Sequence, residues 1–115
     1  MSRNRSGALK VRDAAPLFAA LGDETRLGLV VRLSAEGPLS IARLSEGSDV
    51  TRQAITKHLE LLVEAGFVED TKQGRERIFE LAPKRLEKAR QCLDHISAQW
   101  DTALDRLKDF VEKER

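Results

Sequence analysis

TRQAITKHLELLVEAGFV, residues 51–68, is the stretch of the chain that decides its fold. Thr51 is suited to begin a helix, because its hydroxyl can accept a hydrogen bond from a free backbone amide of the first turn. Apolar residues then recur with the i, i+4, i+7, i+8 spacing of one buried helical stripe, at Ile55, Leu59, Leu62 and Val63. Gly66 is the residue type that often ends a helix, and Phe67 opens an extended segment behind it. The stretch therefore predicts a helix that leads directly into a β-hairpin.

The first turns of this predicted helix are polar on the side that the apolar stripe leaves outward. That side carries Arg52, Gln53, Thr56 and Lys57, and Thr51 precedes them. Two of the four are cationic and two can both donate and accept hydrogen bonds, a combination that suits base edges and phosphates. An ordinary solvated helix face is the alternative interpretation. His58 lies at the edge of the apolar stripe, where we expect a partly packed histidine first and a phosphate contact second.

Two further helices are predicted before this one. Residues 1–12 are polar and basic without periodicity, and we expect them to form a flexible arm. Asp13 is suited to cap the first helix, and Asp23 is suited to cap a second helix that ends at Gly37. The second helix has four candidate core residues, Leu27, Val30, Val31 and Leu33. Arg26, in its first turn, is expected to form a structural ion pair.

A short helix and a short turn connect this region to the residue-51 helix. Ser40 is expected to cap a helix that reaches about Glu46, and the free amides behind this cap can also meet a phosphate. Residues 47–50 form the turn. Two helices joined by so short a turn pack at a steep angle, which predicts a helix-turn-helix.

The segment after the residue-51 helix predicts two strands around a turn at Gln73 and Gly74. Phe79 and Leu81 alternate with polar residues, as expected for a half-buried strand. Three cations lie on the predicted hairpin, Lys72, Arg75 and Arg77. Such cations are usually only solvated, but beside a polar helix start they become candidates for phosphate or minor-groove contacts.

Residues 83–115 predict one long helix with a strict heptad pattern. Leu86, Leu93, Trp100 and Leu107 are seven apart, and Ala89, Ile96, Ala103 and Phe110 follow each of them by three. This apolar stripe is longer than a body of this size can cover, so we expect a second copy of the chain to pack on it. The expected homodimer interface contains Leu86, Leu93, Ile96, Trp100, Ala103 and Leu107, with Leu17 and Phe18 of the first helix.

The length and composition limit the classes of protein that the chain can belong to. With 115 residues it forms a single domain, in which we expect residues 13–82 to be the core and residues 83–115 the dimerisation helix. One cysteine, Cys92, rules out an intramolecular disulfide and any multi-cysteine metal site. No apolar run reaches the length of a membrane span, so we expect a cytoplasmic protein. A phosphate loop, paired catalytic carboxylates and a nucleophile–base pair are all lacking, which indicates that the protein is not an enzyme.

Three segments carry a resemblance to a known family: LGDETRLGLVVRL (residues 21–33), ITKHLELLVEAGFV (55–68) and GRERIFEL (74–81). In this order they resemble the ArsR/SmtB family of winged-helix repressors, over about residues 14–113. The resemblance implies a mainly α-helical winged helix-turn-helix with a small β-hairpin and long N- and C-terminal dimerisation helices. It also implies a homodimeric repressor that binds double-stranded DNA at an inverted-repeat operator; an inducer, if there is one, is not identified by the sequence. A winged-helix dimer that contacts only other proteins is the alternative, although the polar helix start beside a basic hairpin favours DNA.

The chain departs from the metal-sensing members of that family. Those members have a cysteine pair in the helix before the turn, where this chain has LSIARLSE (residues 39–46), so it resembles the branch without these cysteines. Other members hold zinc between paired C-terminal helices. The candidates for such ligands here are Asp94, His95 and Asp101, but the first two are adjacent and point about 100° apart on a helix. Because zinc needs converging ligands, we expect neither a metal site nor a cofactor.

Overall fold

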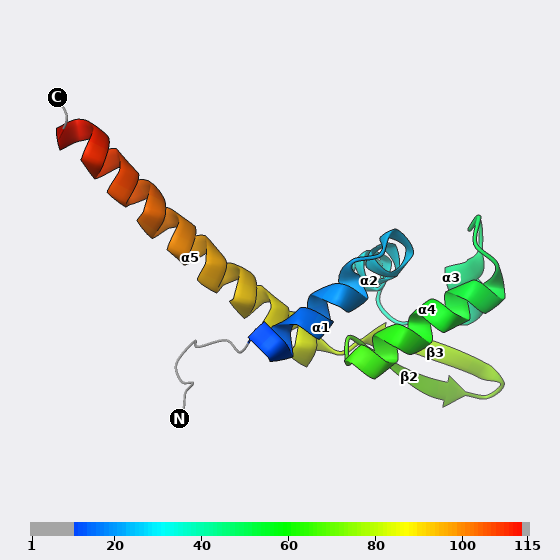
Figure 1. The fold of residues 1–115 in the computed structure, drawn as a ribbon. Coiled ribbons are helices and arrows are strands. Elements are labelled where there is room, and N and C mark those ends of the chain that lie inside the picture. The colour runs from blue at the N-terminus through cyan, green and yellow to red at the C-terminus, as the bar shows by residue number, and fades with distance from the viewer. Residues whose placement is uncertain (1–10, 114–115) are drawn as a thin grey trace.

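Five helices and three short strands follow one another in residues 11–113, the part of the chain that the computed structural model describes (Figure 1). In chain order they are α1 (Val11–Leu21), α2 (Glu24–Glu36), β1 (Leu39–Ser40), α3 (Ile41–Ser45), α4 (Arg52–Ala65), β2 (Val68–Gln73), β3 (Glu76–Leu81) and α5 (Pro83–Lys113). The helix-turn-helix is α3 and α4, and the hairpin β2–β3 is the wing. The predicted fold class, a mainly α-helical winged helix-turn-helix with a long C-terminal helix, is confirmed.

The first helix begins earlier than the sequence predicts. α1 starts at Val11, two residues before the expected cap Asp13. Asp13 instead lies in the first turn, where a carboxylate is favourable because the N-terminal end of a helix carries partial positive charge. The arm predicted for residues 1–12 was therefore too long by Val11 and Arg12, and its remaining residues, 1–10, lie outside the described part of the chain.

The ends of the other helices are where the capping residues predict them. Asp23, Ser40 and Thr51 each accept a hydrogen bond from the backbone amide three residues later, over 3.0, 3.1 and 3.1 Å. Gly66 ends α4 with φ at 87°, a left-handed conformation that glycine adopts without strain. The Arg85 side chain packs directly over Gly66, so a Cβ there would lie 2.7 Å from its Cγ. This glycine thus serves both the turn into the wing and the close approach of α5.

One hydrophobic core joins all the elements except the outer part of α5. Its residues are Leu17, Leu29, Val30, Leu33, Ile41, Leu44, Ile55, Leu59, Leu62, Phe67, Val68 and Phe79. In α2 the buried residues are Leu29, Val30 and Leu33, whereas the predicted core residues Leu27 and Val31 are 47% and 59% exposed. That prediction was wrong because α2 has more apolar residues than one buried face can hold, and the face centred on Leu29, Val30 and Leu33 is the one turned inward.

The wing belongs to a three-stranded antiparallel sheet with the order β1–β3–β2. β1 has only two residues, and it pairs Leu39 with Phe79 and Ser40 with Ile78. The sequence did not predict this strand, which adds a third strand to the hairpin and attaches the wing to the start of α3. Phe79 is fully buried and Leu81 half-buried, as predicted.

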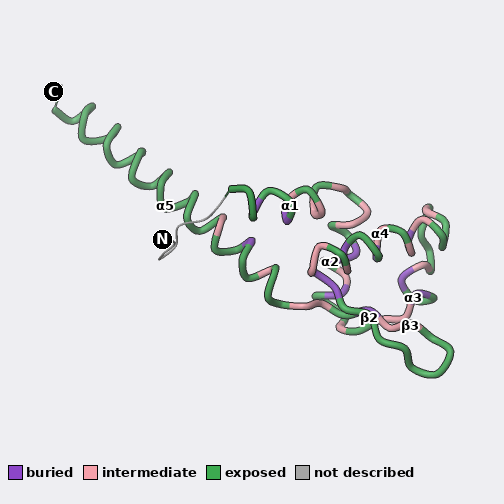
Figure 2. The backbone as a smooth tube through the Cα atoms, turned by 60° about the horizontal axis from the view of Figure 1, so that its bottom comes forward, coloured by how far each residue is buried: buried purple, intermediate pink, exposed green. Residues whose placement is uncertain are grey.

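The long helix α5 has two parts with different surroundings. Its first turns lie against α1, where Leu86 packs on the core and Ala89 is buried. We call residues 11–90 the head, and residues 91–113 distal α5. Figure 2 shows the buried residues confined to the head, while distal α5 extends away from it and is exposed almost throughout. No helix in residues 11–113 combines the length and apolar character needed to cross a membrane.

α1 places one of the predicted interface residues, Leu17, inside the head. Leu17 is only 4% exposed and belongs to the core of the head. Leu86 packs against the same core, and Phe18 is half-buried. The prediction for Leu17 was wrong because the α1 side that carries it faces α2, α4 and α5 of its own chain rather than a second copy.

Candidate nucleic-acid interface

The start of α4 and the tip of the wing lie at the same end of the molecule. Figures 1 and 2 both place them at the end of the head opposite the free end of α5. Thr51, Arg52, Gln53 and Lys57 are exposed there, as predicted from the outward side of the helix. The buried stripe of α4, with Ile55, Leu59 and Leu62, holds this helix against the core and leaves its first turns open.

Thr56 differs from its neighbours on α4. It is half-buried, and its hydroxyl donates a hydrogen bond to the Arg52 carbonyl oxygen over 2.8 Å. The prediction of an outward-facing Thr56 was thus only partly correct, because a threonine hydroxyl in a helix commonly bonds the carbonyl of the preceding turn. Its oxygen can still accept a hydrogen bond, but its proton is already used.

Ser40 lies at the start of α3, on the strand β1. Its hydroxyl accepts a hydrogen bond from the backbone amide of Arg43, which satisfies one of the free donors of the helix start. The cap predicted from the sequence is therefore present. Arg43 itself lies near Glu36 and Glu46, at 3.6 and 3.7 Å, so its charge is shared with two carboxylates of the head.

His58 is part of a polar cluster that connects α4 to the preceding helices. Its Nδ1 lies 3.2 Å from Nη1 of Arg26 and 3.8 Å from Oδ2 of Asp23. Arg26 also donates from Nε to the carbonyl oxygen of Ala20 at the end of α1, over 2.6 Å. Arg26 therefore has the predicted structural role, but its side chain bonds a carbonyl and a ring nitrogen rather than a carboxylate.

Asp23 is the acidic member of the same cluster. Its carboxylate accepts the backbone amide of Arg26, and this hydrogen bond lowers the pKa of Asp23 below its ordinary value; the nearby His58 and Arg26 side chains lower it further. With His58 half-buried against Asp23 and Arg26, its ring faces the neighbouring helices. The partly packed histidine expected from the sequence is what the structure contains.

The three basic residues of the wing have different surroundings. Lys72 and Arg75 are exposed beside the turn at Gly74, whose φ is 64°. Among the ion pairs within residues 11–113, none includes Lys72 or Arg75. Both side chains therefore remain available to phosphates at the tip of the wing.

Arg77, by contrast, is bound within the protein. Its Nε donates to Oδ2 of Asp70 over 3.2 Å, and its Nη2 forms an ion pair with the same oxygen. Its Nη1 lies 3.6 Å from Oε2 of Glu60, on α4, and its guanidinium carbon lies 5.1 Å from the centre of the Phe79 ring. The hydrogen bond to Asp70 raises the pKa of Arg77 further above its already high value. Arg77 therefore has a structural role within the protein, and its expected contact with DNA stays a prediction.

Sequence reasoning missed both acidic partners of Arg77. Asp70 was available as a signal, because a hairpin turn at residues 74 and 75 places Asp70 two pairs further from the turn than Arg77, on the same face. Glu60 gave no local signal, since it reaches the wing only through the packing of α4 on the sheet.

Distal α5 has a continuous apolar face that nothing within residues 11–113 covers. Leu93, Ile96, Trp100 and Leu107 are 43–63% exposed, and Ala103 is exposed as well. The same face includes Leu104, Phe110 and Val111, each about half exposed or more. Leu104 and Val111 were not predicted, because they fall outside the strict heptad but lie four residues after Trp100 and Leu107 on the helix surface.

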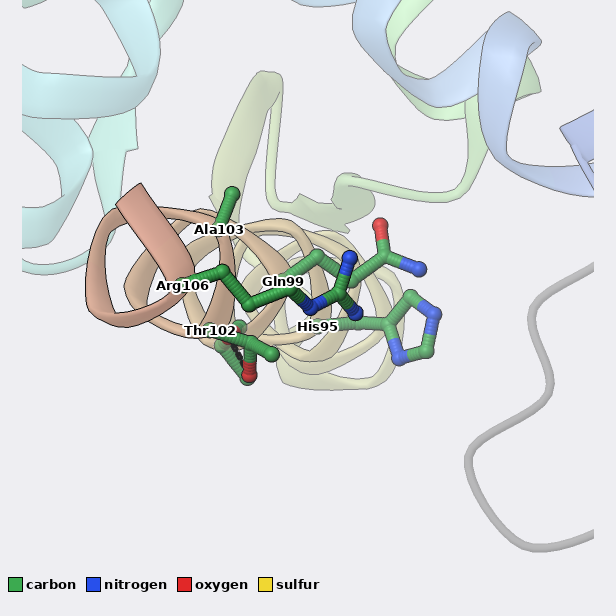
Figure 3. A pocket seen from close by; sticks show the side chains of 6 residues that line it. His95, Gln99, Thr102, Ala103 and Arg106 are labelled. Carbon is green, nitrogen blue, oxygen red and sulfur yellow. Dashed lines mark hydrogen bonds between the residues drawn. The ribbon is translucent and has the colours of Figure 1, made fainter. Parts of the chain in front are cut away.

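A more polar side of distal α5 lies next to this apolar face, and Ala103 belongs to both. A hollow of about 410 Å³ is lined there by His95, Ala98, Gln99, Thr102, Ala103 and Arg106, all on α5. Figure 3 shows the labelled side chains on the outside of this single helix, so the hollow is open and does not enclose a ligand. Within the described chain, no group of three or more His, Cys, Asp and Glu side chains could hold a metal ion.

Comparisons with known proteins agree with this geometry. Residues 21–71 match a family model described as a helix-turn-helix domain. The chain is 36% identical over 97 residues, 84% of its length and 87% of the relative's, to the HTH-type transcriptional regulator Rv2034 of Mycobacterium tuberculosis. It is 43% identical over 67 residues to the arsenical resistance operon repressor of Escherichia coli, across 58% of this chain and 57% of that one.

Solved structures show the same arrangement. An ArsR-like transcriptional regulator from Rhodococcus sp. RHA1 is 37% identical and superposes with a TM-score of 0.70, over 86% of this chain and 92% of the other. A second structure, the ArsR family transcriptional regulator RHA00566, has a TM-score of 0.73 at 26% identity, over 82% of this chain and 96% of that one.

Proposed function

The chain belongs to the ArsR/SmtB family of winged helix-turn-helix transcriptional regulators, which bind DNA, and we propose that it acts as a homodimeric repressor at an inverted-repeat operator. The observation that carries this proposal is the position of the first turns of α4 beside the wing tip. Exposed Arg52, Gln53 and Lys57 lie at the same end of the head as exposed Lys72 and Arg75. A helix start beside a basic hairpin fits a major groove together with the flanking phosphates.

The proposed dimer forms through distal α5. Its apolar face extends over residues 93–111, about 27 Å at 1.5 Å per residue, which is long enough for a substantial helix–helix contact. Phe18, half-buried on α1, contributes at the edge of this contact, whereas Leu17 and Leu86 stabilise the head of each subunit. In this arrangement residues 13–82 are the DNA-binding core and residues 83–115 are the dimerisation helix.

Two copies of α4 then face the same side of the DNA. The proposed operator is an imperfect inverted repeat whose half-sites are separated by about one helical turn, roughly 34 Å. Arg52 and Gln53 lie on the first turn of α4, where side chains can reach base edges, and Lys57 lies one turn further along. Thr51, Thr56, Ser40 and His58 support this end of the helix-turn-helix more than they contact bases, through the caps and hydrogen bonds described above.

The proposal predicts different effects for base-contacting and phosphate-contacting residues. Gln53→Ala should reduce affinity for the best operator by about 1–3 kcal/mol, and affinity for scrambled DNA much less, because a bidentate base contact is lost. Lys72→Ala or Arg75→Ala should weaken binding to both DNAs alike and reduce the slope of log affinity against log salt by about one unit. The operator for these measurements comes from selecting genomic fragments that bind the purified protein.

The same isotherms contradict the proposal if the base-contacting and phosphate-contacting residues show each other's predicted effects. Base preference that is unchanged in Gln53→Ala but altered in the wing variants would mean that the wing, and not α4, contacts the bases. A wild-type protein that sediments as a monomer at micromolar concentration would exclude the two-fold arrangement on an inverted repeat.

A further inference from the structure

The register of the wing explains why the Arg77 side chain turns toward the protein. Arg77 pairs with Lys72, and Phe79 pairs with Asp70, so these four side chains share one face of the hairpin. Phe79 is fully buried, so this face is the one that packs on the core. Arg77, two residues nearer the turn, lies over the Phe79 ring and reaches Glu60 on α4.

From this geometry we infer that Arg77 is a positioning residue that fixes the wing relative to α4. The inference rests on the proposed function, since it assigns Arg77 a role within the proposed DNA-binding surface. The Arg77 guanidinium interacts with two carboxylates, from β2 and from α4, and a DNA phosphate would have to displace them. Its planar, multiply donating shape suits two carboxylates and an aromatic ring at once, which a lysine ammonium cannot match.

The position of Arg77 along the hairpin determines which wing residues depend on its connection to α4. Beyond the Arg77–Lys72 pair only the Gln73–Glu76 pair and the turn remain, and they include Arg75. The two phosphate-contacting cations proposed for the wing, Lys72 and Arg75, therefore lie at or beyond the place where Arg77 connects the hairpin to α4. If that connection is lost, strand pairing alone positions them relative to the bases contacted by α4.

The test uses three variants of the full chain and two measurements. Arg77→Gln removes the cation, Arg77→Lys keeps the charge without the guanidinium geometry, and Asp70→Asn removes one carboxylate. Without DNA, amide hydrogen exchange in residues 70–78 should be faster in all three than in the wild type. With DNA, each variant should bind the operator about fivefold more weakly at every salt concentration, as for the loss of a small ion-pair network, with an unchanged salt slope.

A direct phosphate contact by Arg77 would give the opposite pattern. Arg77→Gln would then reduce the salt slope by about one unit, as Lys72→Ala does, and Arg77→Lys would bind almost as well as the wild type. Asp70→Asn would bind more tightly, because it removes a negative charge near the DNA and frees Arg77. Any of these results would overturn the inference.

The exchange measurement separates this inference from the proposed function. Glu60→Gln is a further variant, which removes the partner of Arg77 on α4. If amide exchange in the wing is unchanged in both Arg77→Gln and Glu60→Gln, the positioning role is overturned, whatever the DNA results are. A wild-type protein without operator binding would instead contradict the proposed function, and the exchange rates would still decide whether Arg77 holds the wing.

Discussion

The head and distal α5 have similar proportions of apolar residues but bury them to different extents. In the head, twelve apolar residues from six of the seven elements before α5, and from the adjacent linker, form one cluster whose members are at most 9% exposed. In distal α5, seven large apolar side chains lie on one face and all are at least 43% exposed. Both regions have the helical periodicity of buried surfaces, but only the head has its partners within the described chain.

The difference indicates that periodicity predicts that a face will be buried, without showing what covers it. The stripe of α4 is covered by the wing and by α2, within one subunit. The stripe of α5 is covered only as far as Leu86 and Ala89, and beyond them it extends away from the head. We therefore expect the head to be stable through its own contacts and distal α5 to depend on a second copy.

The largest effect should come from charges on the α5 face. Leu93→Glu combined with Trp100→Glu should dissociate the proposed homodimer, because burying unpaired carboxylates costs several kcal/mol. Sedimentation equilibrium at micromolar concentration should show monomers, and operator affinity should fall on the order of a thousandfold. The matched control is Leu27→Glu combined with Val31→Glu on α2, since these side chains are 47% and 59% exposed, much like Leu93 and Trp100 at 52% and 63%.

The control variant should remain dimeric and should bind the operator. If both double variants behave alike, exposure alone explains the effect, and distal α5 is no more an interface than α2 is. If Leu93→Glu with Trp100→Glu remains dimeric, another surface holds the two copies together.

The local parts of the fold could be predicted because a few neighbouring residues determine them. A hydroxyl or carboxylate three residues before a free amide is enough to begin a helix, as at Asp23, Ser40 and Thr51. The left-handed end of α4 at Gly66 and the turn at Gly74 are similarly local. For the same reason, the exposed side chains at the start of α4 and at the wing tip were found from sequence.

The parts that sequence reasoning missed depend on contacts between distant segments. β1 becomes a strand only because β3 lies beside it, and two residues have no strand signal of their own. The choice between Leu27 and Leu29 as a core residue depends on how α2 is rotated against α4 and β3. The ion pair between Arg77 and Glu60 was missed because Glu60 lies on another element, whereas the charge of Arg77 was visible in the sequence.

Two phenylalanines, one in each region, test the same difference between buried and exposed apolar side chains with single substitutions. Phe79 is fully buried in the head, and Phe110 is 61% exposed on distal α5. Phe79→Ala should lower the free energy of unfolding by about 3–5 kcal/mol and leave the dimer dissociation constant almost unchanged, because it creates a cavity within one subunit. Phe110→Ala should instead weaken dimerisation by up to about 3 kcal/mol, the value of burying a phenylalanine.

Urea unfolding combined with sedimentation equilibrium separates these two effects. A loss below about 1 kcal/mol for Phe79→Ala would be too small for a fully buried aromatic side chain. A dimer dissociation constant that is unchanged in Phe110→Ala would mean that the interface ends before the last turns of α5.

The smallest expected effect concerns two helix caps of the head that differ only in their chemistry. Asp23 caps α2 with a carboxylate, and Ser40 caps α3 with a hydroxyl that does not titrate. Because the folded state lowers the pKa of Asp23 below 3.8, its carboxylate stabilises the fold fully above that pH, and this contribution is lost as the pH falls below 3.8 through the folded value.

Asp23→Ala should therefore destabilise the protein clearly at pH 6 and less as the pH falls below 3.8. Ser40→Ala should cost about 1 kcal/mol at both pH values, since only an uncharged hydrogen bond is removed. Urea midpoints for both variants and the wild type at pH 6 and pH 3 provide the measurement. An Asp23→Ala effect that is as large at pH 3 as at pH 6 would show that the carboxylate charge contributes nothing, and that Asp23 holds α2, Arg26 and His58 through geometry alone.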